Sequence, residues 1–417
     1  MAKQFFIYLI SVVLSSQMSL GQNRGKQDLL SAKIDSILQA SVDVSEIPGA
    51  VVLIKQGDQE IHKAAYGYAS LKNYNHHVLA HPERTSIDHL YDIASLTKVV
   101  GTTTAIMLLI DDGLIKIDDP VSLYIKAFDT PEKSKITIRH LLTHTAGLYE
   151  WYPLYYFANT KKEVYNLIDN LPLKYPVGSD RHYSDLGFIL LGEIIERVSK
   201  LPLDQFMKQR IFKPLGMNHT MFNPLHHDTE LKMAATSHGN PYERRMISDA
   251  VLGFSIDSIN PNQWDGWRKY TLKGEVNDGN AWYANNGFSG HAGLFSTVSD
   301  LQKVVDMLRY DGKVGNQQFV SKQTVRLFLT QDKFMNGLGW VMDTSNAFMK
   351  NAPNGSFGHT GFTGTSIAVV PQCDISIVLL INRQNMGLLP SQKYINLNKI
   401  RAQVFRAVMD YCTPLKN

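Results

Sequence analysis

The stretch Tyr91-Asp92-Ile93-Ala94-Ser95-Leu96-Thr97-Lys98-Val99-Val100 places a hydroxyl and an amine three residues apart, where a helix is expected to begin. Apolar residues recur behind it at helical spacing, so this helix should be buried. Because residues three apart share one helix face, the Lys98 amine can lie beside the Ser95 hydroxyl. We expect apolar surroundings to lower the pKa of Lys98, so that the amine can take the serine proton. S-x-x-K also arises by chance in long chains, so the remaining sequence has to support this interpretation.

Length and composition are those of a globular protein. The chain has 417 residues, enough for one large domain or two intermingled ones. Apolar residues make up 44% and charged residues 19%, and the net charge is only +4. No basic run or arginine-rich helix occurs, so we expect no nucleic-acid partner.

The N-terminus has the pattern of a secretory signal peptide. Lys3 precedes an apolar run over residues 5–14, and small residues follow at Ser19 and Gly21. This pattern predicts a signal peptide over 1–21, cleavage before Gln22, and a periplasmic or secreted protein without a stable membrane span. The alternative is an uncleaved anchor, but the apolar run is short for a bilayer.

Export would permit a disulfide, and the chain has two cysteines, Cys373 and Cys412. They either pair or form two separate buried thiols, and the sequence leaves both alternatives open. Neither has a metal-ligand spacing.

Both ends of the chain carry a hairpin pattern. Near the start, runs 50–54 and 61–66 flank Gly57-Asp58, and near the end, runs 365–370 and 375–381 flank a Pro-containing turn. Each hairpin has a helical pattern on its outer side. We therefore predict one antiparallel sheet lobe (22–90 and 285–417) with terminal helices, and an inserted, mainly helical lobe (91–284). Residues 222–284 resemble long site-forming loops.

Two further polar triplets stand where helix or strand patterns begin. Tyr183-Ser184-Asp185 precedes a helix, and His359-Thr360-Gly361 precedes a strand. S-x-x-K, a Y-x-N-like triplet and a K-T-G-like triplet, in this order, resemble the penicillin-recognising serine hydrolases. This family comprises class C-type β-lactamases, D,D-peptidases and related esterases. Further stretches match it over most of the chain: 119–121, 138–148, 175–178, 214–217 and 293–301.

The resemblance implies a β-lactamase/transpeptidase-like α/β (α+β) fold and a set of roles. Ser95 would be the nucleophile, and Lys98 and Tyr183 would activate it and move its proton. Backbone N–H groups of Ser95 and Phe362 would hold the oxyanion. Stretches 275–281, 289–293 and 358–365 look most like low-molecular-mass D,D-carboxypeptidases, and the chain also resembles family VIII-type esterases.

Two departures from the family pattern bear on substrate. Histidine replaces the usual lysine at His359, and histidine is mostly neutral at pH 7, so carboxylate recognition should be weaker and pH-dependent. Asp185 replaces an asparagine, and an ionised carboxylate cannot donate to a substrate carbonyl. We therefore expect weak β-lactamase activity at most, which leaves an esterase or a peptidase acting on uncharged or amine-bearing acyl groups.

The resemblance puts His291 near the cleft, as a substrate contact or a structural group, together with Asp185, His359, Thr360, Gly361 and Phe362. His144 is expected to be structural. No histidine spacing indicates a metal, and we expect no metal or cofactor. Aromatic residues at 149–156 and 264–283 would either line the cleft or anchor loops.

These observations predict an exported serine hydrolase that forms an acyl-enzyme on Ser95. Its partner would be a small-molecule, peptide or glycopeptide substrate carrying an ester or amide, such as a peptidoglycan-derived D-amino-acid peptide. Alternatives are a broad-range carboxylesterase and a penicillin-binding receptor that does not turn over. The sequence does not determine the oligomeric state.

Overall fold

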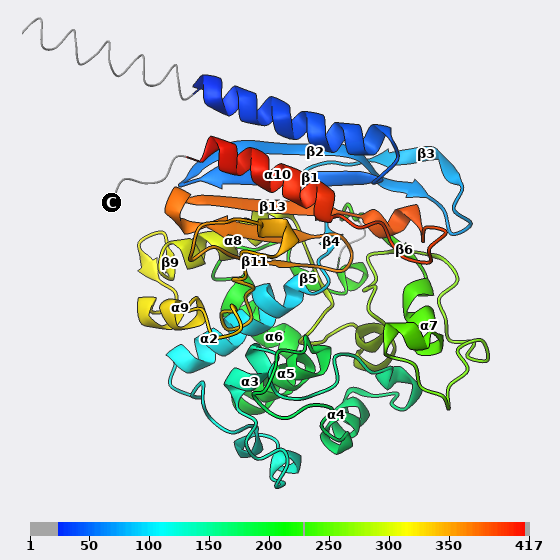
Figure 1. The fold of residues 1–417 in the computed structure, drawn as a ribbon, viewed down its shortest axis with the longest axis vertical. Helices are drawn as coiled ribbons and strands as arrows, with labels where there is room; N and C mark the ends of the chain where they lie inside the picture. Colours follow the sequence, from blue (N-terminus) through cyan, green and yellow to red (C-terminus); the bar gives the residue numbers. More distant parts are fainter. Residues whose placement is uncertain (1–23, 228–229, 413–417) are drawn as a thin grey trace, which may run out of the picture.

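The computed structural model describes residues 24–227 and 230–412, and the predicted signal peptide lies outside them. Its central layer is a six-stranded antiparallel sheet with the order β11-β12-β13-β1-β2-β3 (Figure 1). The strands are β1 (Gly49–Gln56), β2 (Gln59–Lys72), β3 (Val78–Arg84), β11 (Phe357–Thr360), β12 (Ser366–Val370) and β13 (Ile375–Ile381). The two ends of the chain meet where β1 pairs with β13. The predicted sheet built from both ends is confirmed.

Helices cover both faces of this sheet. The N-terminal helix (24–43) and α10 (Asn398–Tyr411) lie on the outer face, and α8 (Val298–Arg309) contacts β1 and β13 from the inner side (Figure 1). Side chains of β1 alternate between the two faces: Val52 packs with the terminal helices, whereas Val51 and Leu53 join the core shared with the helical layer. This period of two is what a strand buried on both faces requires.

The helical layer lies beneath the sheet in Figure 1. Its helices are α2 (Thr104–Asp111), α3 (Ile138–Leu142), α4 (Lys161–Asn170), α5 (Asp185–Ser199), α6 (Leu203–Met207), α7 (Pro241–Ser248) and α9 (Lys322–Phe328). Three wider helical turns are η1 (Lys98–Thr103), η5 (Lys208–Phe212) and η8 (Asn280–Ala284). Single 3₁₀ turns are η2 (Val121–Leu123), η3 (Lys126–Phe128), η4 (Leu154–Tyr156), η6 (Pro224–His226), η7 (Ala250–Leu252), η9 (Ala347–Met349), η10 (Pro371–Cys373) and η11 (Arg383–Met386).

Short strands join the layers. They are β4 (Tyr91–Asp92), β5 (Met221–Phe222) and β8 (Leu294–Ser296) in one small sheet, and the pairs β6 (Ala235–His238) with β7 (Thr271–Lys273) and β9 (Lys313–Val314) with β10 (Gln317–Gln318). The 222–284 region combines short elements (β6, α7, β7 and η8) with a stretch over 253–270 that has no helix or strand, so the predicted long loops are present in part. The sequence shows little helical periodicity there because α7 is only eight residues long. The lobe boundaries at 90 and 285 stay a prediction.

The open question of the cysteines is resolved. Cys373 and Cys412 form a disulfide, with their Cα atoms 5.7 Å apart, which ties the β12–β13 turn to the end of α10. Among the described helices, none combines the length and apolar character needed to cross a bilayer.

Candidate active site

Ser95 stands in a tight turn between β4 and η1. Ala94 before it has a left-handed φ of 45°, and Asp92 Oδ1 accepts a hydrogen bond of 2.8 Å from the Ala94 N–H. A non-glycine residue in this conformation is strained and needs such support. Ser95 is half-buried, while its chain neighbours are buried. The turn therefore leaves Ser95 partly exposed to solvent, while the residues on either side of it are buried.

Lys98 lies directly behind Ser95 and is completely buried. Its Nζ donates to Ser95 Oγ at 3.0 Å and to the backbone oxygen of His291 at 3.0 Å. It also pairs with Asp185 Oδ1 at 2.7 Å. Three acceptors match the three N–H bonds of an ammonium. The predicted proximity of the Ser95 hydroxyl and the Lys98 amine is thus present in the structure.

The prediction that apolar surroundings lower the pKa of Lys98 is wrong. Burial is the largest influence and does oppose the charge, but Asp185 and Tyr183 together outweigh it, so the pKa of Lys98 is raised. Lys98 is therefore an ammonium at neutral pH. It can orient the Ser95 oxygen and stabilise negative charge, but as an ammonium it holds no lone pair that could accept the serine proton.

Tyr183 is placed by the start of α5. Ser184 caps this helix through a hydrogen bond from Gly187 N–H to its Oγ, 3.2 Å long, which puts Tyr183 just outside the first turn. Lys98 Nζ lies 5.1 Å from the centre of the Tyr183 ring. The His144 ring packs against that ring in a tilted arrangement, with the ring centres 4.4 Å apart, and its Nδ1 accepts the Ser184 N–H at 3.0 Å. His144 thus holds the tyrosine, in keeping with a structural role.

The end of β11 forms the opposite wall. Thr363 Oγ1 donates to Asp92 O at 2.7 Å, which ties the β11–β12 turn to the Ser95 segment. A Cβ on Gly361 would lie only 2.5 Å from Ile93 O, so glycine permits this close approach. In the described part of the chain, the N–H groups of Ser95 and Phe362 donate to no protein acceptor. Both are therefore available for an oxyanion.

His359 is neutral over the whole physiological range. It is only 3% exposed, and burial together with the nearby charge of Lys98 lowers its pKa to about 3. The expected pH dependence of carboxylate recognition at this residue is therefore wrong, because titration falls far below pH 7. His359 Nδ1 lies 2.9 Å from Thr360 O, which fixes the ring.

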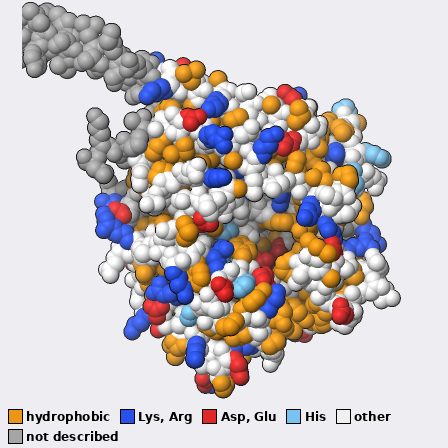
Figure 2. All heavy atoms as spheres, in the orientation of Figure 1, with side chains coloured by type: hydrophobic (Ala, Val, Ile, Leu, Met, Phe, Trp, Pro, Cys, Tyr) orange, Lys and Arg blue, Asp and Glu red, His pale blue; other side chains and the backbone are white. Residues whose placement is uncertain are grey.

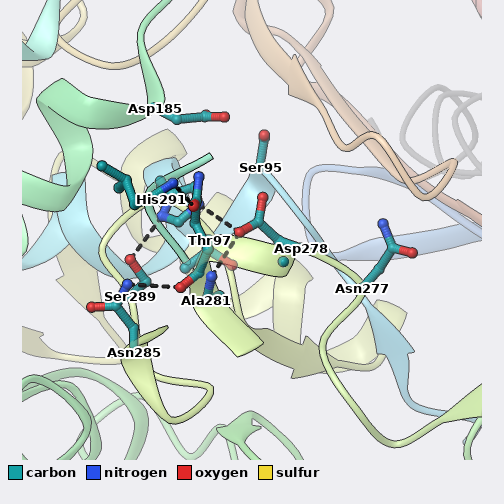
Figure 3. A network of polar contacts seen from close by, with 12 residues as sticks. Ser95, Thr97, Asp185, Asn277, Asp278, Ala281, Asn285, Ser289 and His291 are labelled. Carbon is teal, nitrogen blue, oxygen red and sulfur yellow. Dashed lines mark hydrogen bonds and ion pairs between the residues drawn. The ribbon is translucent and has the colours of Figure 1, made fainter. Parts of the chain in front are cut away.

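A further carboxylate, Asp278, was not singled out in the sequence. Its side chain points toward Ser95 in Figure 3, and Oδ1 accepts from Ala281 N–H at 2.8 Å and contacts His291 Nε2 at 2.9 Å. Burial raises the pKa of Asp278, but the combined effect of His291, Ala281 N–H and Lys98 lowers it, so Asp278 is ionised at neutral pH. His291 is buried, and its link to the cleft is its contact with Asp278.

Three ligand-type groups meet at this point. Oxygen atoms of Asp185 and Asp278 and a ring nitrogen of His291 all lie within 4.8 Å of one another. Lys98 already supplies a cation to this cluster, through its ion pair with Asp185 and its charge interaction with Asp278. The absence of a metal requirement remains a prediction.

Aromatic residues from the two loops pack on one another behind Asp278. The Tyr155 ring lies 5.3 Å from Trp264 and 5.1 Å from Tyr283, and Trp264 lies 4.7 Å from Trp267. Tyr155 Oη donates to buried Glu243, whose other oxygen accepts the Gly279 N–H at 2.8 Å. These contacts favour the loop-anchoring interpretation of the aromatic residues.

The position of Asp278 gives a testable expectation. Asp278→Asn should lower kcat about 10- to 100-fold, since a charged group facing the nucleophile is removed while the acceptor for Ala281 N–H is retained. Steady-state kinetics with a chromogenic ester measures the loss. Asn277→Asp, which adds a carboxylate one residue away, is the comparison. Unchanged kcat in Asp278→Asn would exclude a role for this charge in turnover.

Comparisons with known proteins agree with this geometry. The family model described as Beta-lactamase matches residues 34–396. A "Putative D-alanyl-D-alanine carboxypeptidase" of Salmonella heidelberg (strain SL476) is 34% identical over 400 residues, covering 87% of this chain and 88% of that protein. The same description and coverage apply to a relative from Salmonella typhi.

Solved structures share the fold. EstCE1, described as a hydrolase with promiscuous acyltransferase activity, has a TM-score of 0.67 at 22% identity, over 92% of this chain and 99% of that one. The penicillin-binding protein homologue from Pyrococcus abyssi has a TM-score of 0.65 at 20% identity, over 92% and 78%. The predicted fold is confirmed, and the chain belongs to the beta-lactamase family of serine hydrolases.

Proposed function

We propose that the protein hydrolyses an ester or amide through an acyl-enzyme on Ser95, with D-alanyl peptides derived from peptidoglycan as its substrate class. The observation that carries the chemistry is the contact of 3.0 Å between Ser95 Oγ and the buried Lys98 ammonium, with Tyr183 against the same ammonium. The substrate class is supported by the 34% identity to relatives described as carboxypeptidases.

In the acylation step, Tyr183 as phenolate accepts the Ser95 proton while Ser95 Oγ forms a bond to the substrate carbonyl carbon. The N–H groups of Ser95 and Phe362 stabilise the resulting oxyanion. Collapse of this intermediate breaks the bond to the leaving group, which takes the proton from Tyr183. Lys98 remains an ammonium throughout, because Asp185 neutralises it at 2.7 Å.

Deacylation repeats these transfers with water. Tyr183 accepts a proton from the water while the water oxygen attacks the acyl carbon. The bond between the acyl carbon and Ser95 Oγ then breaks, and Tyr183 returns the proton to the serine oxygen. The ionised Asp278 carboxylate points toward Ser95 (Figure 3), where it can accept a hydrogen bond from this water and orient it.

A broad-range esterase is the second candidate. His359 is neutral and Asp185 is paired with Lys98, so neither residue supplies the cation that the resemblance places at position 359 for a substrate carboxylate. Uncharged esters need no such group. The same two residues argue against efficient β-lactam hydrolysis, and the intact Ser95, Lys98 and Tyr183 argue against a receptor that does not turn over.

Export is part of the proposal. The pattern over residues 1–21 supports cleavage before Gln22 and action in the periplasm or outside the cell. N-terminal sequencing of the protein recovered from a periplasmic or secreted fraction tests this, since retention of Met1 or recovery from the cytoplasm alone would contradict it.

The test of function compares three substrates on purified residues 22–417: a p-nitrophenyl short-chain ester, a chromogenic cephalosporin and a D-alanyl-D-alanine peptide. Release of D-alanine, absent in Ser95→Ala, supports the carboxypeptidase assignment. Ester cleavage alone would instead establish the esterase alternative. Failure of all three would contradict the proposed substrate classes.

A further inference from the structure

Arg181 stands two residues before Tyr183, and its guanidinium has no polar partner within 24–227 and 230–412. No described residue accepts a hydrogen bond from it or forms an ion pair with it, and its buried Nε is unsatisfied. Burial lowers the pKa of Arg181, but an arginine stays charged at neutral pH. An unpaired and partly buried charge is costly, so a structure that retains one beside a reactive side chain needs a reason.

The neighbour of this charge is the proposed proton carrier. Arg181 Cζ lies 5.8 Å from the centre of the Tyr183 ring. The same phenol is surrounded by basic side chains from three other parts of the fold: Lys98 of η1 at 5.1 Å, His144 after α3 at 4.4 Å and His359 of β11 at 6.0 Å. Burial keeps both histidines neutral, so the fixed positive charges beside Tyr183 are Lys98 and Arg181.

Carboxylates near this group do not cancel Arg181. Asp185, at the start of α5, is engaged with Lys98 at 2.7 Å. Asp332 and Asp343, from the segment that follows α9, interact with Arg181 through space without forming an ion pair with it. Ionised Asp278 acts on Lys98 as well. The charge of Lys98 is therefore offset by carboxylates, whereas Arg181 is the cation beside Tyr183 that has no ion-pair or hydrogen-bond partner among the described residues.

We propose that Arg181 is a positioning residue that stabilises the negative charge on the Tyr183 oxygen whenever Tyr183 holds no proton. This inference rests on the proposed function, in which Tyr183 takes and returns the serine proton. The resemblance described above places a lysine at the position of His359. Here that residue is neutral, and Arg181, two residues before Tyr183, supplies a second fixed cation beside the phenol.

The charge interaction is large enough to matter. Unit charges about 6 Å apart interact appreciably at the effective dielectric constant of about 20 that suits a protein site near the surface. Loss of such a charge disfavours the phenolate, so the enzyme needs a higher pH to reach its active form. Arginine suits this role better than histidine because it never loses its proton in the working range.

The experiment is a pH profile of kcat/KM with a p-nitrophenyl short-chain ester, which carries no carboxylate. Arg181→Gln should move the acidic limb about one pH unit upward, so that activity well below the limb falls about tenfold while the plateau is less affected. Arg181→Lys should keep most of the wild-type profile. Arg406→Gln, which removes the same charge from an exposed site on α10, is the matched control and should superimpose on wild type.

The outcomes separate the alternatives. An unmoved acidic limb in Arg181→Gln, with kcat lowered equally at every pH, would show a structural role and overturn the proposal. A rise confined to KM for a D-alanyl-D-alanine peptide would show a substrate-carboxylate contact and overturn it too. Should Arg181→Gln not fold, Arg181→Met, which keeps much of the side-chain length without the charge, takes its place: an acidic limb moved upward supports the proposal, and an unmoved limb with lowered kcat contradicts it. Absence of both ester turnover and D-alanine release in wild type would count against the proposed function itself.

Discussion

Replacing Ser95 by alanine should lower turnover of every substrate by about 10⁴-fold or more, the loss seen when the nucleophile of a serine hydrolase is removed. The fold should tolerate this change. Among the described residues, the Ser95 hydroxyl has one hydrogen-bond partner, the Lys98 ammonium, which keeps its other two acceptors. We therefore expect thermal unfolding to shift by only a few degrees, equivalent to about 1 kcal/mol.

Ser289 provides the matched control for this experiment. Its Oγ lies 2.7 Å from His291 Nδ1, and His291 contacts Asp278, so these residues resemble a Ser-His-Asp relay. However, Ser289 is only 2% exposed and no substrate carbonyl can reach it. Mass spectrometry after trapping with a fluorophosphonate should show one covalent adduct in wild type and Ser289→Ala, and none in Ser95→Ala. An adduct retained in Ser95→Ala would place the nucleophile elsewhere.

The sequence predicted those parts of the site that depend on short spacing. Ser95 and Lys98 are three residues apart, and local helical geometry alone brings their side chains together. The terminal hairpins were also predictable, because short apolar runs flank a Gly-Asp turn near the start and a Pro-containing turn near the end, as expected for strands that are buried on both faces. The order of the three motifs then identified the fold by resemblance.

Long-range electrostatics could not be predicted in the same way. The expected pKa of Lys98 had the wrong sign because Asp185, remote in sequence, is its counterion. The carboxylate of Asp278 was missed for a similar reason: nothing within residues 275–281 indicates that the fold turns it toward Ser95. In both cases, a tertiary contact and not a local pattern decides the charge.

Removing the Lys98 amine should have the second large effect, on activity and on stability together. Lys98→Met leaves the Asp185 carboxylate without its cation and Ser95 Oγ without its donor. Breaking a buried pair by removing one partner costs about 3–5 kcal/mol. Because the Asp185 side chain is 18% exposed, we expect a value at or below the lower end, about 2–3 kcal/mol. Chemical denaturation measures the stability loss, and ester turnover should fall about 10³-fold or more.

The double variant Lys98→Met/Asp185→Leu distinguishes the two effects. Replacing a buried pair by apolar side chains is often neutral, so stability should return while activity stays lost. The pH dependence gives an independent check of sign. Since the pKa of Lys98 is raised in the folded protein above its ordinary value of 10.5, its stabilising contribution is fully present below that value. It is lost as pH rises through the folded pKa, so the stability difference between wild type and Lys98→Met should shrink above about pH 10.5. A difference that instead grew with pH would mean that burial, and not Asp185, controls the charge of Lys98.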